Sequence, residues 1–178
     1  MIVLFTDFGL EGPYIGQVQA VLQQQAPGIP VINLFSDLTP FKIQDAACLL
    51  PAYTSGFPPA TVFLCVVDPG VGGVRPGVVV QADGRWYVGP NEGLFAMLAR
   101  QPGQLECWQL AEPDGVSASF HGRDVFAPVA ARDSHWPHQA WRWKCRGLES
   151  HSRRPLQHRH SNVPHIRRSI AIDAGFQS

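Results

Sequence analysis

The stretch Thr61-Val-Phe-Leu-Cys-Val-Val67 runs directly into Asp68-Pro-Gly-Val-Gly-Gly-Val-Arg75. An unbroken run of apolar and β-branched residues is typical of a strand that is buried on both faces of a sheet. An acid stands where this strand ends, a glycine-rich turn follows, and an arginine comes seven positions after the acid. Ligands of open α/β sheets bind outside the carboxyl ends of the strands. The stretch therefore predicts a buried strand with a functional site at its end.

Two other segments show the same arrangement of an apolar run followed by polar side chains. The N-terminal run 2–5 leads into Thr6 and Asp7, and Ser119-Phe120 leads into His121. Both are interpreted as strand ends, and the carboxyl ends of parallel strands share one edge of a sheet. We therefore expect four side chains to converge at that edge: Asp7, Asp68, Arg75 and His121.

Helical and strand patterns alternate through the first half of the chain. Apolar spacing predicts helices that follow the runs 2–5 and 31–35, with inward faces made by Ile15, Val18, Val21 and Leu22 and by Ile43, Ala46, Ala47 and Leu50. With 61–67 as the third strand, this order favours a parallel sheet with right-handed crossovers.

The middle of the chain predicts an addition to this sheet. The runs 78–80 and 86–88 flank Asp83-Gly84, a pair typical of a tight hairpin turn. A helix over 93–100, a strand over 106–110 and a segment 120–131 that becomes helical near Phe126 are expected to follow. The predicted fold class is α/β, a mostly parallel sheet flanked by helices with an added hairpin.

Composition separates residues 1–132 from residues 133–178. The chain of 178 residues has no net charge, but 1–132 holds 6 Lys/Arg against 11 Asp/Glu and 133–178 holds 8 against 3. The periodicity is lost from about Asp133, where Arg, His, Pro, Ser and Trp become frequent. This pattern indicates a frameshifted or otherwise non-native tail, expected to be disordered. A basic arm that binds nucleic acid is the alternative.

The cysteines and the apolar runs indicate the class of protein. Four cysteines are scattered without the spacing of metal ligands, and no apolar stretch approaches the ~18 residues of a membrane span. A reduced, cytoplasmic protein without a membrane partner, metal site or cofactor is expected.

Each candidate site residue also has a structural interpretation. Asp7 could cap the helix that begins near Gly12 or bind two vicinal hydroxyls of a sugar. Asp68 could accept backbone N–H groups of its glycine turn, with Arg75 as its ion-pair partner. A lone histidine such as His121 is more often structural than catalytic. Their shared position at predicted strand ends favours function.

Five segments together carry a family resemblance. They are TDFG (6–9), LTPF (38–41), VDPGVGGVR (67–75), GPNEGL (89–94) and FHGRDVFAPVAA (120–131). Residues 1–132 thereby resemble the S-adenosyl-L-methionine hydroxide adenosyltransferases, of the same superfamily as the fluorinating and chlorinating enzymes. The resemblance implies hydrolysis of S-adenosyl-L-methionine, in which a water-derived hydroxide attacks the 5′ carbon of the ribose and releases adenosine and L-methionine.

The resemblance also implies roles for particular residues. Asp68, Arg75 and His121 match the residues that activate water, and Asp7 matches the acid that holds the ribose hydroxyls. Phe41 occupies a position that lines the nucleoside pocket in the halogenating relatives. Asn91 is a further candidate contact, although Glu92 departs from the common Pro-Asx-Asn-Gly pattern. The halogenating relatives have a tyrosine in place of Asp68, whose carboxylate would repel a halide, so the hydrolytic branch is favoured.

The family also carries a second, β-rich domain with a Phe-Gly-Asn motif, and its site forms between subunits of a homotrimer. Residues 133–178 show no such domain, so little activity is expected of this chain by itself. Two other functions stay open from the residues alone. One is a metal-dependent hydrolase that uses Asp7, Asp68, His121 and Asp124. The other is a nucleoside- or nucleic-acid-binding module.

Overall fold

The structure is a computed structural model that describes residues 1–72, 75–103, 105–110 and 119–133. Six strands form one sheet in the order β2-β1-β3-β5-β4-β6. The strands are β1 (Ile2–Thr6), β2 (Val31–Phe35), β3 (Val62–Val66), β4 (Gly77–Ala82), β5 (Arg85–Pro90) and β6 (Leu105–Gln109). The first three strands and β5 are parallel, whereas β4 is antiparallel to both β5 and β6. The predicted mostly parallel sheet with an added hairpin is confirmed.

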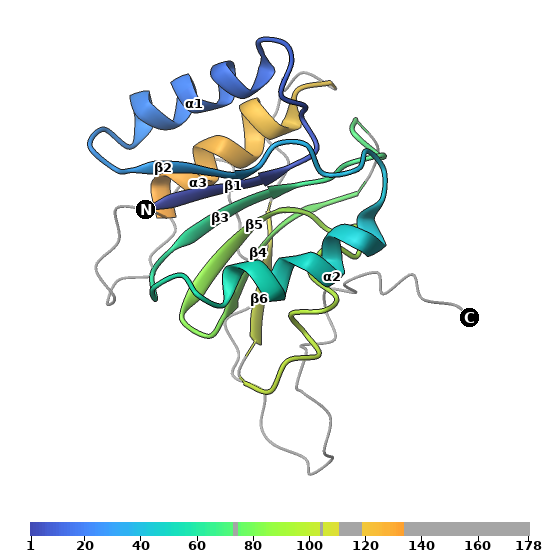
Figure 1. The fold of residues 1–178 in the computed structure, drawn as a ribbon. Helices are drawn as coiled ribbons and strands as arrows, with labels where there is room; N and C mark the ends of the chain where they lie inside the picture. The colour runs from blue at the N-terminus through green and yellow to red at the C-terminus, as the bar shows by residue number, and fades with distance from the viewer. Residues whose placement is uncertain (73–74, 104, 111–118, 134–178) are drawn as a thin grey trace.

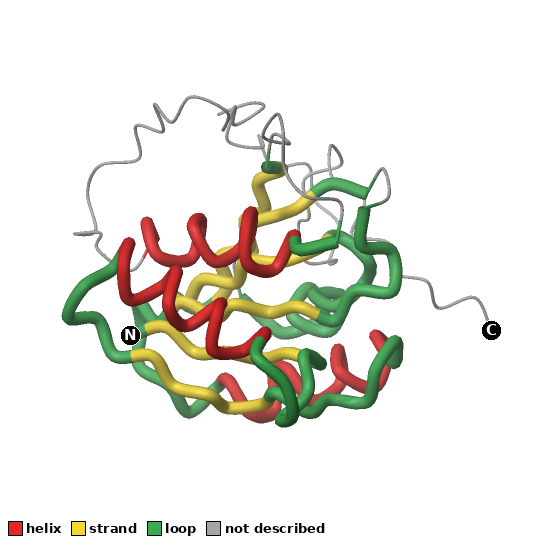
Figure 2. The backbone as a smooth tube through the Cα atoms, turned by 90° about the horizontal axis from the view of Figure 1, so that it is seen from above, coloured by secondary structure: helices red, strands yellow, loops and turns green. Residues whose placement is uncertain are grey.

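Helices cover both faces of this sheet, as Figure 1 shows. Helix α1 (Tyr14–Gln25) lies beside α3 (Ala127–Asp133) on one face, and α2 (Ile43–Thr54) covers the other. A π-helical turn, η1 (Gly122–Phe126), leads directly into α3. The view along the perpendicular direction shows the sheet between these two layers (Figure 2). None of the helices within the described residues is long and apolar enough to cross a membrane.

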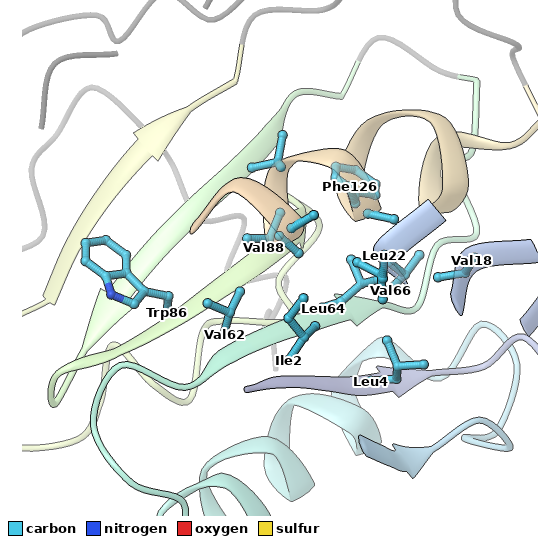
Figure 3. Packing of buried hydrophobic residues seen from close by; sticks show 14 of the residues in the cluster. Ile2, Leu4, Val18, Leu22, Val62, Leu64, Val66, Trp86, Val88 and Phe126 are labelled. Atoms are coloured by element: carbon cyan, nitrogen blue, oxygen red, sulfur yellow. The ribbon is translucent and has the colours of Figure 1, made fainter. Parts of the chain in front are cut away.

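The central strands are buried on both faces, so consecutive residues belong to two different cores. Ile2 and Leu4 pack with Val18 and Leu22 of α1 and with Phe126 (Figure 3). Their neighbours in β1, Val3 and Phe5, belong to the second core, which α2 closes with Ala46 and Leu50. The predicted inward faces of both helices are confirmed.

The hairpin between β4 and β5 has the predicted turn. Asp83 has a φ of 49° and Gly84 a φ of 72°. Positive φ at both central residues defines the turn whose twist matches that of the flanking strands. The turn therefore fixes the register in which Ala82 pairs with Arg85.

Two sequence predictions were wrong. Residues 94–100 form successive turns rather than a helix, in which the Ala96 N–H donates to the Gly93 C=O and the Leu98 N–H to the Phe95 C=O. Leu94, Phe95 and Ala96 are all buried and pack in the second core, and these tertiary contacts take precedence over the local helical spacing. Ser119-Phe120 is likewise not a strand end. The predictions for 134–178 concern residues outside those that the structure describes.

Candidate active site

The end of β3 carries a buried ion pair. The Gly70 N–H donates to Asp68 Oδ1 at 3.2 Å, which is the turn role predicted for this acid. Arg75 Nε–H donates to the same oxygen at 2.7 Å, and Arg75 Nη2 pairs with Asp68 Oδ2. The Asp68 side chain is 6% exposed and that of Arg75 is 9% exposed. The Nε–H hydrogen bond to Oδ1 and the ion-pair contact of Nη2 with Oδ2 together hold the carboxylate against the guanidinium.

A second carboxylate reaches the same arginine from the end of β5. Glu92 Oε1 lies 2.9 Å from Arg75 Nε, and the Glu92 side chain is 21% exposed. In the sequence, Glu92 was noted only as a departure from a family pattern and was not predicted as a site residue. The signal that identified Asp7 and Asp68, an acid just beyond an apolar strand, also applies to this position. The Asn91 N–H donates to the Pro76 C=O at 3.0 Å and connects this strand end to the residue after Arg75.

Asp7 lies at the end of β1, next to β3. Its N–H donates to the Val66 C=O at 3.2 Å, which places Asp7 beside the strand that ends at Asp68. The half-buried carboxyl group accepts a hydrogen bond from the Phe41 N–H; burial raises its pKa, and this hydrogen bond opposes the rise. Asp7 does not cap α1, whose N-cap residue is Pro13 and has no side-chain capping bond.

Phe41 is therefore held beside Asp7 by its backbone, with its ring outside the core. The ring is 69% exposed, and the residue has a φ of 64°. A left-handed conformation at a bulky residue costs about 1–3 kcal/mol and persists only where the surroundings impose it. The Phe41 side chain is thus free of the core, while its backbone N–H is tied to the Asp7 carboxyl group.

His121 starts a helical segment rather than following a strand. The Phe120 C=O accepts hydrogen bonds from the Arg123 N–H at 3.0 Å and the Asp124 N–H at 2.8 Å, which turns the chain at this point. The Ala127 N–H then donates to the Gly122 C=O, five residues back, and makes η1 a π-helical turn. Such turns are rare and are frequent at functional sites.

Close packing fixes both ends of η1 near the other candidates. A Cβ at Gly122 would lie 2.6 Å from Phe8 Cζ, so the residue after His121 contacts the residue after Asp7. A Cβ at Gly77 would lie 2.7 Å from Phe126 Cε1, so the end of η1 lies against the start of β4, close in sequence to Arg75. The Tyr14 hydroxyl accepts the Arg123 N–H at 3.1 Å and further holds the turn.

The structure thus brings the predicted residues together as neighbouring groups. Arg75 contacts Asp68 and Glu92, Asp7 contacts Phe41, and the turn that carries His121 contacts the residue next to Asp7. The roles of these residues, and their convergence on one bound ligand, stay predictions. Within the described ranges, no three His, Cys, Asp or Glu side chains gather where they could hold a metal ion.

The fold and this site define an α/β protein with a charged and aromatic site at the carboxyl edge of its parallel strands. Residues 2–138 match the SAM hydroxide adenosyltransferase N-terminal domain, and the chain belongs to that family. The resemblance identified from the sequence is confirmed.

Individual relatives agree with this membership. The chain is 41% identical over 147 residues to the (R)-S-adenosyl-L-methionine hydrolase of Thermus thermophilus, covering 73% of this chain and 55% of that protein. It is 20% identical to the fluorinase of Nocardia brasiliensis, over 74% of this chain and 53% of that protein. The crystal structure of an uncharacterized conserved protein from Thermotoga maritima matches with a TM-score of 0.73 and 32% identity, over 90% of this chain and 63% of that one.

The length of the match is also informative. The chain spans about half the length of the curated relatives it matches. The activity of the whole protein is accordingly a matter of proposal.

Proposed function

We propose that this chain supplies the water-activating half of an enzyme that hydrolyses S-adenosyl-L-methionine to adenosine and L-methionine. The observation that carries the proposal is the buried Asp68–Arg75 ion pair at the end of β3, in a chain that belongs to this family. The name of the Thermus thermophilus relative, 41% identical, supports the same reaction.

The proposed step is a displacement at the 5′ carbon of the ribose. A water oxygen forms the new C–O bond while the C–S bond breaks. The electron pair of the C–S bond goes to sulfur, which becomes the neutral thioether of methionine. The water loses one proton, so the products are adenosine, methionine and a proton. Sulfonium is a good leaving group, and the protein therefore has mainly to place the water in line with the breaking bond.

The roles of the side chains follow from their contacts. Asp68 is held by Gly70 and by two nitrogens of Arg75, so its carboxylate has a fixed orientation from which it can hold the water. His121 stands at the start of η1 as the base that removes the proton, since imidazole exchanges protons near neutral pH. Positioned general bases contribute typically 10²–10⁴-fold to a rate.

The nucleoside is assigned to the neighbouring group of residues. Asp7 accepts hydrogen bonds from the two ribose hydroxyls, and the exposed ring of Phe41 stacks beside the nucleoside. Asn91, at the end of β5, is a further contact. A homotrimeric assembly of the complete protein and a cytoplasmic location belong to the same proposal.

The test joins residues 1–132 to the C-terminal part of the Thermus thermophilus relative and follows the reaction in oxygen-18 water without added metal. The label is expected in the 5′ hydroxyl of adenosine. Asp68→Ala and His121→Ala should lower turnover by more than about 10²-fold with little change in adenosine binding, whereas Asp7→Ala should weaken binding. No adenosine from the joined protein, or unlabelled adenosine, would reject the proposal.

A further inference from the structure

Two carboxylates lie beside Nε of Arg75. Nε–H donates to Asp68 Oδ1 at 2.7 Å, and Glu92 Oε1 forms an ion pair with the same nitrogen at 2.9 Å. Asp68 and Arg75, one anion and one cation, form a neutral pair when both are ionised. Glu92 therefore supplies the excess negative charge of this three-residue cluster.

The cluster lies where solvent screens charge weakly. The exposed fractions of the three side chains are 6% for Asp68, 9% for Arg75 and 21% for Glu92. Charges that are partly buried interact more strongly than charges in bulk water, because the effective dielectric constant is lower. The charge of Glu92 consequently acts on whatever occupies the space next to Arg75 and Asp68.

The backbone around Glu92 is shaped to admit its carboxyl group. A Cβ at residue 70 would overlap the Glu92 carboxyl group, so this carboxyl group lies directly against the turn that follows Asp68. The Asn91 N–H donates to the Pro76 C=O at 3.0 Å, which holds the backbone next to Glu92 in place. Glu92 is thus packed against the turn that carries Asp68, with its carboxylate on the arginine.

We propose that Glu92 is a specificity-determining residue that keeps anions away from Arg75, so that neutral water rather than a halide is the nucleophile. The inference rests on the proposed function, in which a halide would compete with water. A guanidinium attracts halide ions, and the repulsion that the Asp68 carboxylate exerts on them is largely offset by the charge of Arg75. Glu92 Oε1 lies 2.9 Å from Arg75 Nε, where its charge repels an anion that approaches the guanidinium.

Chloride binding to the full chain tests this inference directly. Glu92→Gln removes the charge and keeps the shape, and line broadening of the ³⁵Cl resonance reports binding at constant ionic strength in gluconate buffer. The dissociation constant for chloride should fall about 10-fold, the effect of removing one nearby charge in a weakly screened site. The control Glu106→Gln removes the same charge from an exposed position on β6 and should leave chloride binding unchanged. Equal chloride binding by the two variants would overturn the proposal.

Two further variants separate charge from shape and guard against a Glu92→Gln protein that does not fold. Glu92→Asn is also neutral and should tighten chloride binding, whereas Glu92→Asp keeps the charge and should bind chloride as weakly as the unaltered chain. Tight chloride binding by the aspartate variant would show that shape decides, and would overturn the proposal. None of these measurements needs adenosine to form, so their failure is distinct from failure of the hydrolase assay.

Discussion

Replacing Arg75 should destabilise the chain more than replacing either carboxylate that contacts it. Arg75→Met keeps an unbranched apolar stem but removes the guanidinium, which leaves the carboxylates of Asp68 and Glu92 without their shared cation. Loss of one partner from a buried ion pair costs about 3–5 kcal/mol, because a buried charge is left uncompensated. In Asp68→Asn, by contrast, Arg75 keeps Glu92 at 2.9 Å, and the loss should be about 1–3 kcal/mol.

Thermal and urea unfolding followed by circular dichroism measure both values. For a domain of this size the larger loss corresponds to a fall in Tm of roughly 10–20 °C. Arg100→Met is the matched control, because Arg100 is exposed and its described contact is a weak one of 3.9 Å to the Met97 sulfur. The control should shift Tm by no more than about 2 °C.

The order of stability of the three variants tests whether Arg75 holds both carboxylates. Arg75→Met should be the least stable, Asp68→Asn intermediate and Arg100→Met close to the unaltered chain. If Asp68→Asn were less stable than Arg75→Met, Glu92 would not be a second partner of the guanidinium. If Arg75→Met matched the Arg100→Met control, the ion pair would contribute nothing to the fold.

Two other perturbations test the neighbouring groups. Burial raises the pKa of Asp7 above its ordinary 3.8, so the folded state holds the neutral acid more tightly than the unfolded state does. The unaltered chain should therefore gain stability relative to Asp7→Asn as the pH falls through the raised pKa. The gain should be less than about 1 kcal/mol, because the carboxyl group is half exposed. Urea midpoints of both proteins from pH 7 to pH 4 measure this difference, and a relative loss of stability on acidification would contradict the prediction. Gly122→Ala should lower the free energy of unfolding by about 1–3 kcal/mol, because the new Cβ would lie 2.6 Å from Phe8 Cζ. Gly16→Ala lies in an open part of α1 and should raise the free energy of unfolding by about 0.5–1 kcal/mol in the same urea titration. Equal effects of the two alanines would show that the Gly122 contact is not restrictive.

The parts of the fold that follow from local pattern were predictable from the sequence. β1 and β3 are unbroken apolar runs, and the Asp83-Gly84 pair has the positive φ angles that its turn requires. The segment 94–100 was not predictable in this way, since its buried consecutive residues are fixed by packing under the second core. Helical spacing over seven residues does not distinguish the two outcomes.

The site was predictable to the extent that strand ends could be located. Asp7 and Asp68 follow strand ends, whereas Arg75 precedes the start of β4. The ion pair between Asp68 and Arg75 was one of the interpretations open from the sequence. The π-helical turn that begins next to His121 was not predictable from the sequence, because it depends on contacts of Gly122 with Phe8. Glu92 was visible as an acid after a strand, but only the distance to Arg75 identifies its partner.

Two irregular segments of the backbone lie beside the candidate site, and left-handed residues also occur elsewhere, at Ala60 and Asp83. Phe41 holds a left-handed φ of 64°, and η1 replaces an α-helical turn with a π-helical one. Phe126 of η1 is part of the first core, whereas Phe41 is exposed and belongs to neither core. Such conformations cost about 1–3 kcal/mol each and persist where the surrounding structure imposes them. Both irregularities lie beside groups to which chemistry is assigned, Phe41 on Asp7 and η1 on His121. In the proposed function, both segments belong to the part of the chain that binds the nucleoside and activates water, so their cost in stability has a functional explanation.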